Sequence, residues 1–477
     1  MTIARRTVLL IVGAMVAGLG IRVANIVWWR PTEVPPVRST GFTPRNPDAL
    51  VLGGDGFFYH HGANALADGR GFIDPFFLVN LNSIEPSGTH PPAYTVYLAA
   101  FSLVGLDTPL EHRLASALLG LVTIVAVAGA ARQLAGDRAA VIAAWMVALY
   151  PGAWINDTML LSEALAQAAV ACFLYASVRL WRERSWPWAA ASGLAAGVAT
   201  LTRNEQIVLF GVLLIMVVAR RGQSLRAGIR LASVAALAGA VLIVPWVVRN
   251  RTTFQQPSYL TTATGSALSA ASCAETYSGE AIGWYQNCFH GPFPTRAVDP
   301  KTKMTYLVDA EGHRVDESTR DIEPLRQARS WIGDHLDEYP KVVAARVGRL
   351  WGWFRPLQTT RFEILFESRG RWQSWLGLVS LWALEMLGVV GLVIMRRRRL
   401  PISPIVALIG VATFGAAITF GVARYRSTAE IGLLLAASIA VSSGLDRFGF
   451  RRRDHQESAA SIPIPPNNTQ TTSAETR

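Results

Sequence analysis

The chain has 477 residues, of which 51% are hydrophobic and 16% charged, and its formal net charge is +12 at pH 7. This composition excludes a soluble protein and indicates one that crosses a membrane several times. The positive charge gathers in short loops between apolar segments, where it signals membrane topology, so we expect no nucleic-acid partner.

The first apolar segment follows Arg5 and Arg6, a pair that places the N-terminus in the cytoplasm. The segment is too long and too aromatic at its exit for a typical cleaved signal peptide, which stays the alternative. Placing the later arginine clusters inside as well requires about ten spans, with both termini cytoplasmic in a multi-pass protein of the cell membrane. The expected spans are 7–29, 113–134, 138–153, 159–180, 188–202, 205–219, 227–248, 373–395, 401–423 and 429–445.

Residues 91–106 are also apolar, but a crossing there would move the loop with Arg132 and Arg138 to the outside. We therefore expect a juxtamembrane or re-entrant helix on the outer face. Pro91-Pro92 suits its first turn, because a proline there loses no hydrogen bond.

The spans divide the chain into four regions. Cys273 and Cys288 stand 15 residues apart in an outer region, where an oxidising exterior permits a disulfide; two free thiols are the alternative. The regions are an N-terminal transmembrane half (1–249) with a first outer loop (30–112), an outer loop region (250–372), C-terminal transmembrane helices (373–450) and a disordered cytoplasmic tail (451–477).

The first outer loop contains VLGGDGFFYHHGANALADGRGF, in which a short helix is expected at 57–67. Asp55 stands where that helix needs an N-cap, so its carboxylate is either a cap or a catalytic base. The two roles are compatible, because a cap holds its side chain in a fixed orientation.

Other polar residues of this loop have two interpretations each. Tyr59 either contacts substrate or rests in the lipid interface, and Glu85 and His90 either contact substrate or are solvated. His60 and His61 point about 100° apart on a helix, which makes a poor chelating pair. A divalent metal is possible for this protein but the sequence does not indicate one, and it calls for no other cofactor.

Charged residues recur at the outer ends of the spans. Asp157 and Glu163 flank one outer turn, and Glu163 begins the returning helix, where the helix dipole favours an acid. Arginines at three outer turns oppose the positive-inside rule. Snorkelling explains any one of them, but their recurrence favours a bound phosphate, because the guanidinium fork suits phosphate oxygens. These arginines are Arg203, Arg249, and Arg424 with Arg426.

The chain resembles the GT-C membrane glycosyltransferases, in the branch of protein O-mannosyltransferases and bacterial aminoarabinose transferases. The resemblance covers roughly residues 7–445, and TTATGSALSAASCAETYSGEAIGWYQNC is similar to a form seen in actinobacterial members. It implies an all-α polytopic bundle of about ten transmembrane helices, with outer-face juxtamembrane helices and a periplasmic loop region. The motifs, each weak alone, are DGFFYHHGANALADGRGF, HPPAY, LLSEALA, LTRNEQ, PWVVRNR and RYRSTAE.

The resemblance also implies roles for single residues. Asp55 corresponds to the acid proposed as general base, and Glu163 falls where the family often has a second acid. His90 stands where the family commonly has a lysine, a departure that leaves a phosphate contact there in doubt. The arginines at family positions are Arg203, Arg249, Arg424 and Arg426.

The expected activity is inverting transfer of a hexose or pentose, mannosyltransferase-like, from a polyprenyl-phosphate donor on the outer face of the membrane. The acceptor is a hydroxyl of an envelope glycan, glycolipid or protein, and membrane lipid is a further partner. Two alternatives stay open. A lipid-sugar transporter or flippase would carry charges at mid-membrane and internal repeats. A non-enzymatic envelope assembly protein would tolerate the loss of Asp55.

Overall fold

A computed structural model describes residues 4–28, 52, 54–218, 224–291, 293–302 and 304–460, with side chains up to residue 447. Part of the expected first outer loop (30–51) and most of the expected tail (461–477) lie outside the described residues. α20 (Ser427–Ala460) continues to Ala460, into the segment where the sequence predicts a disordered tail.

The protein is an all-α polytopic membrane protein, as the sequence predicts. Six helical segments of the described chain are long and apolar enough to cross a membrane. They are α1 (Arg5–Val27), α6 (Pro109–Leu149), α8 (Glu163–Glu183), α11 (Leu225–Thr253), α18 (Arg371–Arg397) and the part of η2 and α20 between Ala423 and Arg447.

Four further helical pieces correspond in position to the other expected spans. α6 bends at Gly136, whose φ is 85°, so its two halves correspond to two expected spans. The others are the shorter helices α9 (Trp186–Thr200), α10 (Val208–Val218) and α19 (Ser403–Ile418). α5 (Ala93–Ser102) has only ten residues, or about 15 Å, which is too short to cross a hydrocarbon core of about 30 Å.

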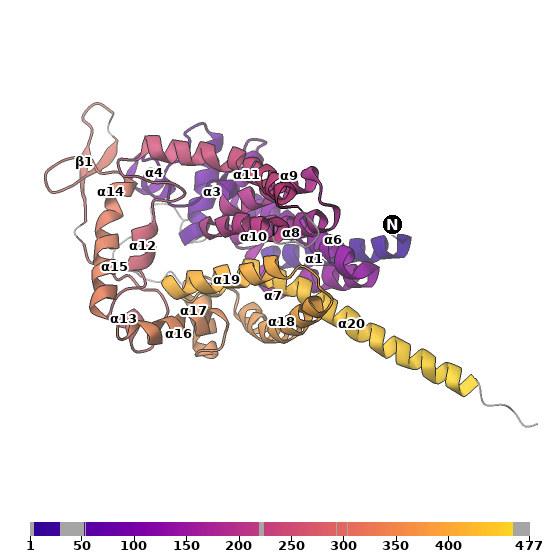
Figure 1. Cartoon of the computed structure of the whole chain (residues 1–477). Coiled ribbons are helices and arrows are strands. Elements are labelled where there is room, and N and C mark those ends of the chain that lie inside the picture. The colour runs from indigo at the N-terminus through magenta and orange to yellow at the C-terminus, as the bar shows by residue number, and fades with distance from the viewer. Residues whose placement is uncertain are drawn as a thin grey trace, which may run out of the picture.

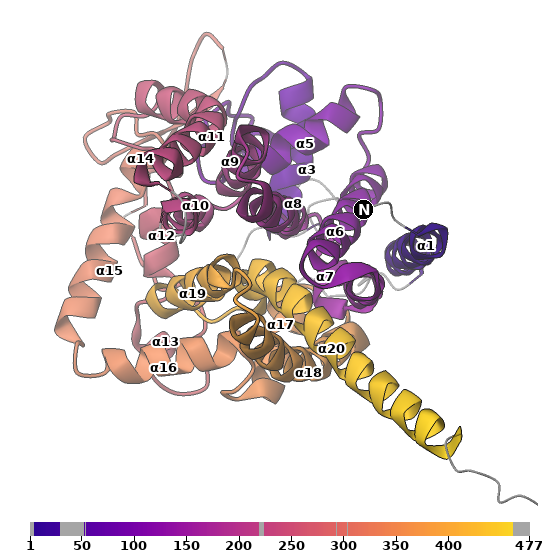
Figure 2. The same cartoon turned by 45° about the vertical axis from the view of Figure 1, so that its right-hand side comes forward.

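Short elements connect and cover the spans at one end of the bundle. Figures 1 and 2 show α12 to α16 gathered on one side, and Figure 1 places them at the end away from the N-terminus and from the far end of α20. The full set of short elements in the described chain is α3 (Gly54–Ala67), α4 (Pro75–Leu81), α7 (Pro151–Asn156), η1 (Asn204–Ile207), α12 (Thr264–Ser269), α13 (Ala274–Tyr277), the antiparallel pair β1 (Thr295–Val298) and β2 (Thr305–Val308), α14 (Glu317–Arg320), α15 (Ile322–Asp334), α16 (Tyr339–Leu350), α17 (Pro356–Phe366) and η2 (Ala423–Arg426).

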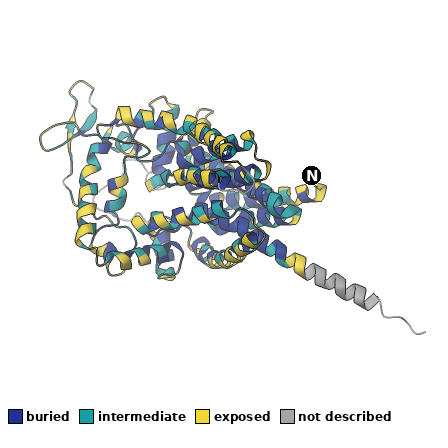
Figure 3. Cartoon of the chain, viewed as in Figure 1, coloured by how far each residue is buried: buried dark blue, intermediate teal, exposed yellow. Residues whose placement is uncertain are grey.

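The helices of the bundle differ in how deeply they are buried, and glycines allow close packing at two contacts between them. The most apolar part of α20 is 83% buried and that of α8 is 72% buried, against 17% for α11, so α11 lies at the periphery. Figure 3 shows the buried ribbon at the centre and exposed turns along α11. Gly391 and Gly193 lie against the backbone of Ala436 and Ala235, because glycine lets two membrane helices approach closely.

A buried ion pair ties α1 to the turn after α7. Arg22 Nε and Nη2 each lie 2.7 Å from Asp157 Oδ2, and the side chains are 0% and 1% exposed. Asn25 on the next turn of α1 donates to Thr158 Oγ1 at 2.7 Å. Asp157, one of the two acids noted at this outer turn, therefore has a structural partner inside the bundle.

Gly120 on α6 makes room for this pair. A Cβ at position 120 would lie 2.2 Å from Arg22 Nε and 2.6 Å from Asp157 Oδ2. Separating a buried ion pair costs about 3–5 kcal/mol, so we expect Gly120→Val to lower the apparent melting temperature of the full-length protein in detergent strongly. Gly211→Ala on α10 is the control, because nothing lies within 4 Å of its added Cβ. Equal melting of the two variants would show that the pair does not depend on this glycine.

Candidate active site

Asp55 lies inside the first turn of α3, which begins at Gly54, one turn earlier than the sequence predicts. Asp55 is therefore within the helix and is not the residue that precedes it. An acid in a first turn is still favoured by the helix dipole. The carboxylate is 30% exposed, so it is held by the fold and still accessible.

Two side chains contact this carboxylate. Arg424 Nη1 donates to Asp55 Oδ2 at 2.5 Å, and His90 Nε2 lies 3.7 Å from Asp55 Oδ1. Arg424 comes from η2, where it also lies beside Glu367, with 3.4 Å between Nε and Oε2. Tyr285 in turn donates its hydroxyl to Glu367 Oε1 at 2.9 Å. Arg424 thus stands between two carboxylates, and Asp55 is one of them.

Arg203 forms the second half of the cluster. Its Nη1 lies 2.6 Å from Glu163 Oε1, and its Nε lies 2.6 Å from Glu205 Oε1. The guanidinium carbons of Arg203 and Arg424 lie 4.8 Å and 5.8 Å from the centre of the Tyr425 ring. Both guanidinium groups therefore lie close to the same aromatic ring.

Tyr59 completes the group. Its ring centre lies 5.1 Å from that of His90, and the carboxylates of both Asp55 and Glu163 raise the pKa of its hydroxyl in addition to the larger effect of burial. The structure thus brings together six of the residues that the sequence singles out. We name this set the Asp55 cluster: Asp55, Tyr59, His90, Glu163, Arg203 and Arg424.

The charge state of the cluster follows from these contacts. Burial would raise the pKa of Asp55, but the neighbouring cations, Arg424 first among them, together outweigh burial and lower it to about 2. Burial lowers the pKa of His90, and Asp55 opposes that effect only in part. At neutral pH Asp55 is therefore an anion, and His90 is a neutral hydrogen-bonding group.

Three other residues singled out by the sequence lie elsewhere. Glu85 pairs with Arg314 Nη2 at 3.1 Å, which links the first outer segment to the outer region. Arg249 donates to the carbonyl oxygens of residues 87 and 72, each at 2.9 Å. Arg426 is buried, with Glu430 Oε1 2.6 Å from its Nε.

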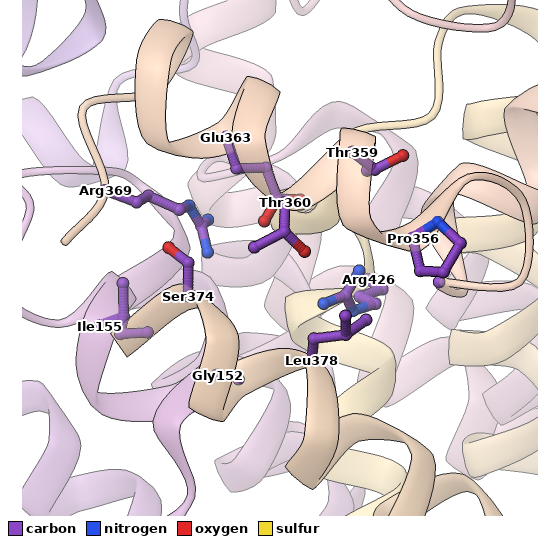
Figure 4. Close-up of a pocket in the computed structure, with 12 residues that line it drawn as sticks. Gly152, Ile155, Pro356, Thr359, Thr360, Glu363, Arg369, Ser374, Leu378 and Arg426 are labelled. Carbon is purple, nitrogen blue, oxygen red and sulfur yellow. The ribbon is translucent and has the colours of Figure 1, made fainter. Parts of the chain in front are cut away.

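Arg426 lines a separate pocket, drawn in Figure 4. The pocket encloses about 420 Å³ including its open mouth, and Glu363, Arg369 and Thr360 lie around it. Glu363 Oε1 accepts from the backbone N–H of Ala423, next to Arg424. Two arginines of the η2 turn therefore lie in different places: Arg424 in the Asp55 cluster and Arg426 at this pocket.

Sequence reasoning did not single out Glu205, Glu367 or Tyr425 for this site. Glu205 and Tyr425 adjoin recognised arginines in LTRNEQ and RYRSTAE, so a search for partners beside each arginine would have found them. Glu367 stands in the outer region with no motif around it, and only the fold brings it to Arg424.

The outer region also contains a disulfide between Cys273 and Cys288. The disulfide closes the loop that contains Trp284 and Tyr285. It therefore restrains the segment from which Tyr285 donates to Glu367. Trp284 is fully buried beneath Tyr285 and stacks on it, with 5.2 Å between the ring centres.

Within the described residues, no group of three or more His, Cys, Asp or Glu side chains is arranged to hold a metal ion. His60 instead faces His112, with 3.0 Å between their Nδ1 atoms. Only one of these nitrogens can donate in a hydrogen bond between neutral rings, so the other must accept.

We expect His60 to make the protein less stable in acid. Burial, with His61 and His112, lowers its pKa to about 3, whereas an unfolded histidine has a pKa of about 6.5. The unfolded chain therefore binds a proton that the folded chain does not, and stability falls by about 1.4 kcal/mol per pH unit as the pH drops below about 6.5. The apparent melting temperature of His60→Asn should fall less between pH 7 and pH 5 than that of wild type. His313→Asn, at an exposed position beyond β2, should behave as wild type; identical pH dependence in all three would contradict the expectation.

A model of the dolichyl-phosphate-mannose-protein mannosyltransferase family matches residues 89–248, which are 160 of the 477 residues. The matched range contains His90, Glu163 and Arg203, but not Asp55 or Arg424. No curated protein matches the sequence of this chain.

Solved structures extend the similarity over nearly the whole chain. The archaeal oligosaccharyltransferase AglB from Archaeoglobus fulgidus, in complex with an inhibitory peptide and a dolichol-phosphate, superposes with a TM-score of 0.51 at 15% sequence identity. The match covers 97% of this chain and 52% of AglB, so the chain spans about half the length of that enzyme. The chain has a GT-C fold. ArnT from Cupriavidus metallidurans, bound to undecaprenyl phosphate, matches with a TM-score of 0.42 at 16% identity, over 92% of this chain and 77% of ArnT.

Proposed function

We propose that this GT-C protein transfers a sugar from a polyprenyl-phosphate donor to a hydroxyl of the cell envelope, on the outer face of the membrane and with inversion at the anomeric carbon. The observation that carries this proposal is the contact of Asp55 with Arg424: a partly exposed carboxylate lies directly beside a guanidinium. A reaction that removes a proton from an acceptor and releases a phosphate anion needs these two groups side by side.

In the proposed step, the acceptor oxygen forms a bond to the anomeric carbon as the bond from that carbon to the phosphate oxygen breaks. Asp55 takes the proton of the acceptor hydroxyl. The bonding electrons leave with the polyprenyl phosphate, whose negative charge Arg424 and Arg203 stabilise. Because the leaving group is already a stable anion, no general acid has to protonate it.

Donor binding would also prepare the base. A phosphate that binds Arg424 competes with Asp55 for the same guanidinium. With Arg424 turned to the phosphate, the effect of burial on Asp55 is less opposed, and its pKa rises from about 2 to a value better suited to a base. Positioning of the acceptor supplies much of the remaining rate.

The geometry changes the proposed phosphate-contact set. We assign the phosphate to Arg203 and Arg424, while Glu163 orients Arg203 through their 2.6 Å contact and Tyr59 borders the site. His90, neutral beside Asp55, orients the carboxylate or the acceptor hydroxyl. Arg249 and Arg426 are bound to other parts of the protein, and we propose structural roles for them.

The orientation in the membrane is part of the proposal. The N-terminus and the far end of α20 lie at one end of the molecule, and the short elements α12 to α16 lie at the other (Figure 1). Arg5 and Arg6 at the first end favour a cytoplasmic location for both termini. The Asp55 cluster, built from α3, the segment before α5, the start of α8, the residue before η1, and η2, then faces the exterior.

The test is transfer of labelled sugar in membranes that contain the full-length protein. A panel of hexosyl and pentosyl polyprenyl phosphates identifies the donor, and fractionation of the labelled product into glycan, glycolipid and protein identifies the acceptor. Movement of the intact lipid-linked sugar across the bilayer without transfer would support a flippase. The absence of both transfer and movement with every donor would leave a non-enzymatic assembly role and overturn the proposal.

A further inference from the structure

The segment Ser87–His90 places His90 beside Asp55, the proposed catalytic base. It ends at Pro91-Pro92, which leads into α5, and His90 Nε2 lies 3.7 Å from Asp55 Oδ1. Gly88 within it is packed so closely that a Cβ would lie 2.8 Å from the ring of Phe254. The position of this segment therefore sets the position of His90.

A buried carboxylate from the outer region holds this segment. Glu317, the first residue of α14, accepts from the backbone N–H of Gly88 at 2.5 Å and from Ser87 Oγ at 3.1 Å. It also accepts from Thr89 Oγ1. Glu317 is only 9% exposed and stands more than 220 residues later in the chain than the segment it binds.

The carbonyl oxygens of the same segment are held as well. Arg249 Nη1 donates to Ser87 O at 2.9 Å. The backbone N–H of Thr262 donates to Gly88 O at 3.1 Å, and Thr261 Oγ1 donates to Thr89 O at 2.7 Å. Donors and acceptors of three consecutive residues are thus fixed by groups from α11, from the chain after it and from α14.

We infer that Glu317, supported by Arg249, is a positioning residue that fixes the Ser87–His90 segment and so holds His90 against Asp55. This inference rests on the proposed function. Glu317 acts through the segment, because its hydrogen bonds go to residues 87–89. The outer region thereby contributes to the arrangement of the site without contributing a reacting group.

The chemistry of the contact favours a carboxylate. Three donors converge on Glu317, and an ionised carboxylate is a pure acceptor that satisfies all of them. In Glu317→Gln the amide oxygen can still accept from Gly88 N, but the N–H₂ group must then donate to the Ser87 and Thr89 hydroxyls, so the charge-assisted bonds become weaker neutral ones and both hydroxyls must reorient. The side-chain volume is nearly unchanged, which makes this variant a test of hydrogen bonding.

We expect Glu317→Gln to lower kcat about 10- to 100-fold while KM for the donor changes less than about twofold, because a misplaced group slows the reacting step more than it weakens lipid binding. Hydrogen exchange measured by mass spectrometry on the full-length protein in detergent should show faster exchange of the Gly88 amide. Glu323→Gln, a carboxylate on α15 that pairs with Arg326, is the matched control and should change neither quantity.

Thr89→Val is the second variant, which removes one of the three donors and should give the same changes to a smaller extent. It also keeps the test decisive if Glu317→Gln does not fold. A kcat within twofold of wild type in both variants, or an increase in donor KM that accounts for the whole loss, would overturn the inference. If wild type transfers no sugar, the proposed function fails, and unchanged exchange of Gly88 would show separately that Glu317 does not hold the segment.

Discussion

Asp55→Asn should lower kcat for sugar transfer about 10²- to 10⁴-fold, the range that a positioned general base contributes. Asparagine has nearly the size and shape of aspartate, but its amide cannot take the proton of the acceptor hydroxyl. The substitution also removes the carboxylate that binds Arg424 at 2.5 Å, so the guanidinium is free for the donor phosphate. We therefore expect KM for the donor to be unchanged or lower, which separates loss of the base from loss of binding.

The measurement is initial-rate transfer of labelled sugar in membranes with equal amounts of each full-length variant. Asp68→Asn is the matched control, because Asp68 follows the same helix, is 62% exposed and pairs only at 3.8 Å with Arg70. It should transfer sugar at the wild-type rate. If Asp55→Asn keeps more than half of the wild-type kcat, Asp55 is not the base.

The membrane fold was predictable because it depends on patterns that a sequence displays directly. Apolar stretches of sufficient length specify spans. The turn between the spans expected at 113–134 and 138–153 is found at Gly136, where a positive φ breaks the regular helix. The start of α3 was placed too late, because Asp55 was interpreted as the N-cap of a helix at 57–67, whereas the helix begins at Gly54.

The cluster of charges was predictable only in part. Arginines at outer span ends oppose the positive-inside rule and Asp55 stands at an expected helix start, so Asp55, Arg203 and Arg424 stand out in the sequence, and they do meet in space. Sequence position does not say which way a side chain points. Arg424 and Arg426 are two residues apart on a 3₁₀ turn, about 120° apart in direction, and they reach different partners.

The residues of the outer region could not be found from local patterns. Glu317 and Glu367 approach the site only because this region folds back over the ends of the spans, which brings Glu317 to Gly88 and Glu367 to Arg424. Neither stands in an apolar repeat or a recognisable motif, so nothing in the sequence distinguishes them from solvated acids. Contacts between residues so far apart in the chain appear only in three dimensions.

Arg424→Gln should lower kcat/KM about 10²- to 10³-fold, because removing one preorganised donor from a developing oxyanion has an effect of that size. Its pH profile should change as well. Burial raises the pKa of Asp55 and Arg424 is the largest opposing influence, so removing Arg424 raises that pKa above about 2. A base with a higher pKa becomes protonated at a higher pH, and the variant should lose more activity than wild type between pH 7 and pH 5.

Arg424→Lys separates the two effects. Lysine keeps the positive charge beside Asp55, so the pH profile should stay close to wild type, but it lacks the planar fork that binds two phosphate oxygens, so KM for the donor should rise. Arg251→Gln, an exposed arginine near the end of α11, is the control and should match wild type in both rate and pH profile. A pH profile of Arg424→Gln that coincides with wild type would mean that Arg424 does not set the basicity of Asp55. The exchange of Arg424 between carboxylate and phosphate would then have to be abandoned, even if the rate falls as expected.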